Sequence, residues 1–109
     1  MNADDMYIAI DRICNIFKSY DIYIVGSNSI NYINGWLDED KDIDIIIVGL
    51  DNKEIECLVA KDKIPYVFNK HNGLRLFNGE FDLWGVGSID YYVDRATKDG
   101  YDASHFMLT

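Results

Sequence analysis

Asp42-Ile43-Asp44-Ile45-Ile46-Ile47-Val48 is the stretch that decides the fold of this chain. Its last four residues form a continuous β-branched aliphatic run, which is typical of a central strand covered on both faces of a sheet. Its first three residues alternate two carboxylates with an isoleucine. Side chains two positions apart on a strand share a face, so we expect Asp42 and Asp44 to point the same way.

The segments around this strand alternate between helical and strand periodicity. Apolar residues recur at three- and four-residue spacing near the start of the chain, which predicts an amphipathic helix. Asn78-Gly79 between two short apolar runs is a strong hairpin signal. A helix at 28–34 is expected to have Ser27 or Asn28 as its N-cap and Gly35 as its terminator. The predicted helices span 4–20, 28–34, 53–60, 88–96 and 102 onward, and the other predicted strands span 22–25, 65–69, 74–77 and 80–84.

This alternation predicts one α/β (α+β) domain over residues 1–109, since the length suits a single domain. We expect a mixed sheet of four or five strands with helices packed on it. The helices at 4–20 and 53–60 should cover one face.

Charge limits the partners that this chain is expected to bind. Its formal net charge is −9, and its ten lysines and arginines are scattered, so an extended nucleic-acid groove is not expected. A small nucleotide that arrives with Mg²⁺ remains compatible with this charge, because the metal supplies positive charge. The longest aliphatic run is too short to span a bilayer, and the acidic N-terminus does not resemble a secretory signal. A cytoplasmic protein without a membrane partner is therefore expected.

Three aspartates are the candidates for chemistry. Asp42 and Asp44 begin the aliphatic strand, where an ionised group is costly without a partner, and a divalent cation commonly compensates such a pair. Asp82 lies in Phe81-Asp82-Leu83-Trp84, on a strand expected to lie beside the first. An EF-hand reading of Asp38, Asp40 and Asp42 fails, because Ile43 stands where the turn needs glycine. Residues 38–40 are instead expected to form a solvated acidic loop.

The order Val25-Gly26-Ser27, a short helix to Gly35, and then Asp42-Ile43-Asp44-Ile45 resembles the head of polymerase-β-like nucleotidyltransferases. It is most similar to the branch of tRNA nucleotidyltransferases and poly(A) polymerases. The resemblance implies that Asp42, Asp44 and Asp82 hold two Mg²⁺ ions. It also implies that Gly26 and Ser27 contact the triphosphate of an NTP substrate.

Two functions stay open at this point. One is a Mg²⁺-dependent nucleotidyltransferase that moves a nucleoside monophosphate from an NTP to a hydroxyl of a protein, an RNA end or a small molecule. The other is a non-catalytic acidic protein that uses the same fold to bind or inhibit a basic partner. Arg75 and Lys70 are the candidates for phosphate contacts. Trp84 is expected on the same strand face as Asp82, where it could stack on a base.

Overall fold

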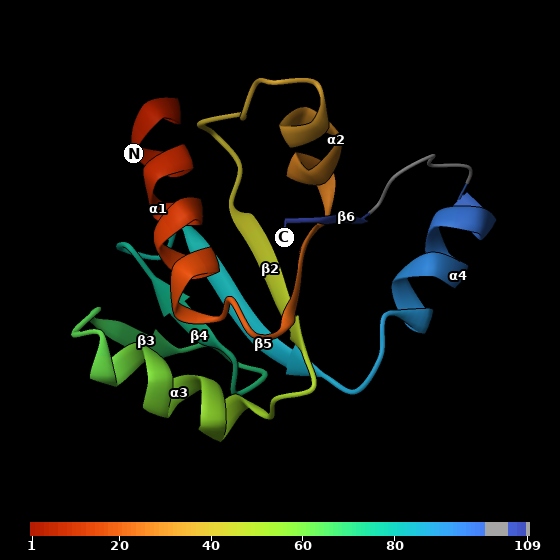
Figure 1. Ribbon diagram of the computed structural model, residues 1–109. Helices are drawn as coiled ribbons and strands as arrows, with labels where there is room; N and C mark the ends of the chain where they lie inside the picture. Colours follow the sequence, from red (N-terminus) through yellow and green to blue (C-terminus); the bar gives the residue numbers. More distant parts are fainter. Residues whose placement is uncertain (100–104, 109) are drawn as a thin grey trace.

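A single six-stranded mixed sheet forms the centre of the molecule (Figure 1). The computed structural model describes residues 1–99 and 105–108, with side chains through residue 94 and at residue 108. The helices are α1 (Ala3–Ile16), α2 (Ser27–Ile33), α3 (Asn52–Lys61) and α4 (Asp90–Asp99). The strands are β1 (Asp21–Val25), β2 (Ile43–Val48), β3 (Tyr66–Phe68), β4 (Leu74–Leu76), β5 (Phe81–Val86) and β6 (His105–Met107).

The strand order across the sheet is β3-β4-β5-β2-β1-β6. The only parallel pair among the described strands is β2 with β5, and the other neighbours are antiparallel. The predicted α+β class with a mixed sheet is therefore confirmed. All five predicted strands are present, and β6 is a sixth strand beyond the four or five expected. The central position of β2 explains its aliphatic run, since a strand with neighbours on both sides has little contact with water.

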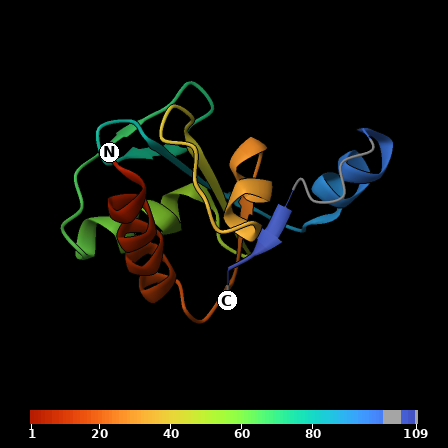
Figure 2. The ribbon, with the colours of Figure 1, turned by 90° about the horizontal axis from the view of Figure 1, so that it is seen from above.

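Helices α1 and α3 lie together on one face of the sheet, as the sequence predicts (Figures 1 and 2). Ile43, Ile45 and Ile47 of β2 point to this face, and each is fully buried. They pack in one apolar cluster with residues of both helices, including Ile13 of α1 and Ile55 of α3. Burial of side chains of this size is worth about 1.5–3 kcal/mol each, so this face supplies most of the stability.

The opposite face of the sheet carries the residues that alternate with this core. Its apolar row follows from the register, which places Ile46 between Tyr23 of β1 and Trp84 of β5. Ile46 is fully buried, whereas Trp84 is half-buried. Two residues earlier on the same strands comes a charged row, which holds Asp44 and Asp82. The two faces of the sheet therefore differ in chemistry as well as in their helical cover.

Three predicted helices have wrong boundaries, and one of them is α4, which spans Asp90–Asp99 and not 88–96. The first helix ends at Ile16 and not at residue 20, because Phe17 is its C-cap and a turn from Phe17 to Tyr20 redirects the chain into β1. The N-cap of α2 is Gly26, with a φ of 78°, and not Ser27 or Asn28. Gly35, with a φ of +84°, follows the C-cap Asn34 of that helix, which agrees with its predicted role as terminator.

The C-terminal prediction is also corrected. Residues 105–107 form strand β6, which pairs with β1, and not part of a helix that begins at Asp102. Pairing with β6 satisfies an edge of β1 that would otherwise be open. Residues 102–104 lie outside the described part of the chain. In the residues that the structure describes, no helix is both long and apolar enough to cross a membrane.

Candidate functional site

The register between β2 and β5 brings two of the predicted aspartates together. Asp44 is the direct partner of Asp82 in this parallel pair, and Arg75 of β4 is the direct partner of Asp82 on its other side. Residues that are paired across a sheet lie on the same face, about 5 Å apart. The predicted side-by-side placement of Asp44 and Asp82 on one face is therefore what the strand pairing produces.

Arg75 forms ion pairs with two of the predicted aspartates, Asp82 and Asp42. Its Nε lies 3.3 Å from Oδ1 of Asp82, and its Nη2 lies 3.4 Å from Oδ2 of Asp42. The same Nη2 donates a hydrogen bond of 2.7 Å to the carbonyl oxygen of Gly79. Asp42 precedes β2 and is exposed, yet this arginine links it to an aspartate on another strand. We call Asp42, Asp44, Asp82 and Arg75 the aspartate cluster.

Asp44 is the most perturbed member of the aspartate cluster. Its pKa is raised to about 6, mainly by partial burial and then by the negative charges of Asp82 and Asp42, while Arg75 acts in the opposite direction. No described residue donates a hydrogen bond to its carboxylate. The cluster therefore holds more negative charge than one guanidinium compensates, which is the condition under which a second cation would bind.

The Gly26-Ser27 segment lies directly beside Asp44. A Cβ atom at position 26 would approach Oδ2 of Asp44 to 3.0 Å, and the φ of Gly26 is one that side chains rarely adopt. Glycine therefore permits both the turn and the close approach. Gly26 and Ser27 are both exposed, so the backbone and hydroxyl predicted to contact phosphates are accessible next to the aspartates.

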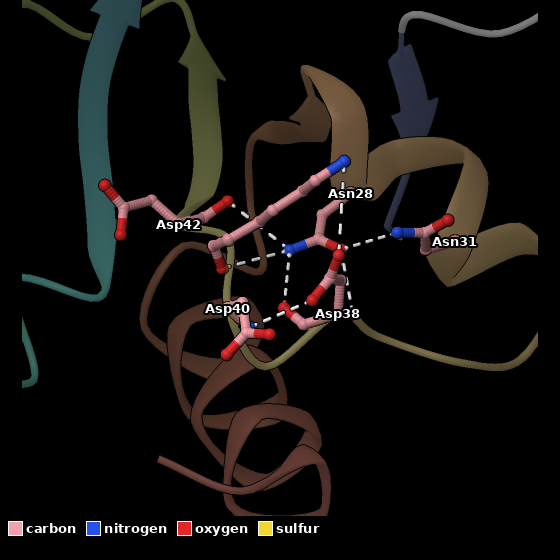
Figure 3. A network of polar contacts seen from close by, with 6 residues as sticks. Asn28, Asn31, Asp38, Asp40 and Asp42 are labelled. Atoms are coloured by element: carbon pink, nitrogen blue, oxygen red, sulfur yellow. Dashed lines mark hydrogen bonds and ion pairs between the residues drawn. The ribbon is translucent and has the colours of Figure 1, made fainter.

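The loop that carries Asp42 is held by a buried asparagine that the sequence analysis did not single out (Figure 3). The side chain of Asn28, only 1% exposed, donates from Nδ2 toward the carbonyl oxygens of Asp38, Lys41 and Asp42 at 3.2–3.4 Å. Its Oδ1 accepts from the backbone N–H of Asp38 and from Asn31. Asn28 thus links α2 to the end of the acidic loop and positions the start of β2.

A second asparagine was also missed. Asn69 accepts the backbone N–H groups of His71 and Gly73 through Oδ1, which closes the β3–β4 turn. Its Nδ2 lies 3.4 Å from Oδ1 of Asp82. The turn-forming sequence Asn69-Lys70-His71-Asn72-Gly73 could have revealed the first role, since asparagine side chains commonly bond the backbone two residues on. Contact with Asp82 depends on strand pairing and has no local signal.

The other predicted site residues take different places. Arg75 lies in the aspartate cluster, whereas Lys70 is exposed in the β3–β4 turn, one residue from Asn69. Trp84 follows Asp82 by two positions on β5 and so lies on the same face, as predicted. Of the acidic loop, Asp40 is exposed, but Asp38 is half-buried and joins the Asn28 network. That loop is therefore less solvated than expected.

The donor set of the aspartate cluster suits a hard divalent cation in chemistry, because all three candidate ligands are carboxylates. In the described residues, however, no three acidic, histidine or cysteine side chains are arranged to hold one ion. Arg75 contacts two of the three carboxylates in this arrangement. A metal shared by all three would therefore require a movement of side chains.

No family model matches the chain, and no curated protein or solved structure compared with it matches either.

Proposed function

We propose that this protein is a Mg²⁺-dependent nucleotidyltransferase that moves a nucleoside monophosphate from an NTP to a hydroxyl acceptor. The observation that carries the proposal is the strand pairing that sets the partly buried Asp44 directly beside Asp82 and close to Gly26. Burial and the neighbouring carboxylates raise the pKa of Asp44 to about 6, which agrees with this placement. A carboxylate held at such an electrostatic disadvantage has a rationale when a cation completes the site. Its position next to Gly26-Ser27 supports the same reading, since the two parts of the recognised pattern meet in space.

In this proposal each part of the site has one task. Asp42, Asp44 and Asp82 would hold the metal, which would supply positive charge to the acceptor oxygen and to the departing pyrophosphate. The exposed Gly26-Ser27 backbone and hydroxyl would orient the triphosphate beside Asp44. Asn28 would act as a positioning residue, because it holds the backbone at Asp42. Trp84 would offer an aromatic surface on the same side of the sheet.

The direct test measures thermal unfolding with each of the four NTPs, with and without Mg²⁺. We expect one or more nucleotides to raise the melting temperature only when Mg²⁺ is present, because a ligand that binds only the folded state stabilises it. Asp44→Ala should abolish this shift while the fold persists. Exposed Asp21, at the start of β1, offers a matched control, and Asp21→Ala should leave the shift intact. Loss of the shift in both variants, or no shift in the wild type, would contradict the proposal.

The formal charge of −9 favours a second candidate, a non-catalytic acidic protein that binds a basic partner. Binding through this charge should weaken as salt rises, because salt screens exposed charges beyond about 8–10 Å. Asp44→Ala should then barely change the affinity for the partner. Wild-type protein that binds no Mg²⁺-nucleotide, yet binds a basic peptide in this salt-dependent way, would replace the first candidate with the second.

A further inference from the structure

Arg75 is the described cation closest to the proposed metal ligands, and it contacts two of them from two separate atoms. Nε faces Asp82 and Nη2 faces Asp42, so one guanidinium spans carboxylates that come from different segments. Because β4 pairs with β5 in register, the arginine starts directly beside Asp82. The strand pairing of the sheet thus delivers a positive charge to the place where the carboxylates converge.

The contacts of this guanidinium with the carboxylates are weak by the standard of such pairs. Distances of 3.3 and 3.4 Å exceed the roughly 2.7–2.9 Å of a strong charge-assisted hydrogen bond. The Nε atom is buried and makes no hydrogen bond to the described residues. The shortest bond of Arg75, 2.7 Å, goes to the backbone of Gly79 and not to an aspartate. The pairing therefore compensates the charge of the carboxylates but leaves the Nε–H of Arg75 without a hydrogen bond to the described residues.

We propose that Arg75 is the built-in counter-cation of the metal-free aspartate cluster, and that a divalent metal must displace its guanidinium in order to bind. This inference rests on the proposed function, because it concerns the same three aspartates. It explains why the carboxylates are not arranged around a common ion in the described structure. It also means that pairing with Arg75 and ligation of a metal compete for Asp42 and Asp82.

Competition predicts that loss of the arginine strengthens metal binding. Calorimetric titration of Mn²⁺, in the absence of nucleotide, would be compared for wild type, Arg75→Gln and Lys18→Gln. We expect Arg75→Gln to bind Mn²⁺ roughly tenfold more tightly, a usual size of coupling between two competing ligands. Lys18→Gln removes the same charge from an exposed turn and should stay within about twofold of the wild type. Arg75→Lys serves as the second variant if Arg75→Gln does not fold, and it should show a smaller gain.

Displacement can also be observed at Arg75 itself. The Nε–H signal of Arg75 should exchange slowly with water in the metal-free protein, because Nε is buried. Saturation with Mg²⁺ should accelerate this exchange, since the guanidinium leaves Asp82. Equal Mn²⁺ affinity in all variants, or an Nε–H signal unchanged at saturating Mg²⁺, would overturn the role of Arg75 and leave the proposed function standing. Absence of metal binding in every variant at millimolar concentration would overturn both.

Discussion

The two faces of strand β2 show how one segment serves stability and chemistry at once. Ile43, Ile45 and Ile47 are fully buried beneath α1 and α3, and each is surrounded by apolar neighbours. Asp44, between Ile43 and Ile45, points to the other face, where partial burial and neighbouring negative charges raise its pKa. Apolar burial on the first face stabilises the folded state, whereas the repulsion between carboxylates on the second face destabilises it. Destabilising groups of this kind cluster at functional sites.

The largest change in the free energy of unfolding is expected at Gly85, where the backbone of Leu50 lies against the helix-covered face of the sheet. A Cβ atom at Gly85 of β5 would lie 1.9 Å from the carbonyl oxygen of Leu50, and backbone cannot yield as a flexible side chain can. Gly85→Ala should therefore lower the free energy of unfolding by at least about 3 kcal/mol. Gly87→Ala, two residues later, meets nothing within 4 Å and should be nearly neutral. Urea denaturation of both variants checks this, and equal stability would contradict the tight packing described at Gly85.

The next largest change in the free energy of unfolding is expected at Asn28, which holds the loop that carries Asp42. Asn28→Ala removes the side chain that bonds the backbone of Asp38, Lys41 and Asp42, and leaves those groups without that partner. We expect a loss of about 2–3 kcal/mol in the free energy of unfolding. Asn34→Ala, at an exposed position, is the matched control and should change it by less than about 0.5 kcal/mol. If Asn34→Ala cost as much, the network in Figure 3 would have no special role.

A smaller change, a gain in the free energy of unfolding, is expected when Asp44 is replaced in metal-free buffer. A pKa raised from 3.8 to about 6 corresponds to about 3 kcal/mol, which solvent screening of this partly exposed group reduces to about 1–2 kcal/mol. The folded state binds the proton more tightly than the unfolded state, so wild-type stability falls as pH rises from about 4 to 6. Asp44→Asn should therefore be more stable than wild type above pH 6 and equal to it below pH 4. A constant difference over this range, measured by denaturation, would argue against the raised pKa.

The smallest effect is expected at an ion pair on the helix-covered side. Nε of Arg12 in α1 lies 3.1 Å from Oδ2 of Asp62 at the end of α3, and both side chains are more than 40% exposed. Water screens such pairs, so Arg12→Gln should cost no more than about 0.5 kcal/mol. Denaturation at low and high salt measures it. A loss above 1.5 kcal/mol would show that this pair does more than join two exposed helix surfaces.

Much of the fold was predictable because it depends on local patterns. The aliphatic run of β2, the Asn78-Gly79 hairpin and the apolar spacing of α1 all specify their elements directly, and each is present. The error at the C-terminus falls where a partner far along the chain decides, and the error at the end of α1 falls where the chain turns into its next element. Strand β6 forms because β1 offers an edge to it, and the turn after Ile16 forms because the chain must enter β1.

The sequence by itself determined that a buried central strand follows Asp42 and that Asp44 faces away from the buried Ile43 and Ile45, because side chains alternate between the two faces of a strand. It also placed Gly26 directly before Ser27, and these are the two residues expected to contact phosphate. Only the tertiary structure decided that Asp82 pairs directly with Asp44 and that Arg75, beside Asp82 in the β4–β5 hairpin, also reaches Asp42. Asp44 and Asp82 are 38 positions apart and Asp42 and Arg75 are 33 positions apart, and local propensity carries no information about which residues so distant in sequence meet. The same holds for Asn28, whose partners lie in a loop that only the closed fold brings within its reach.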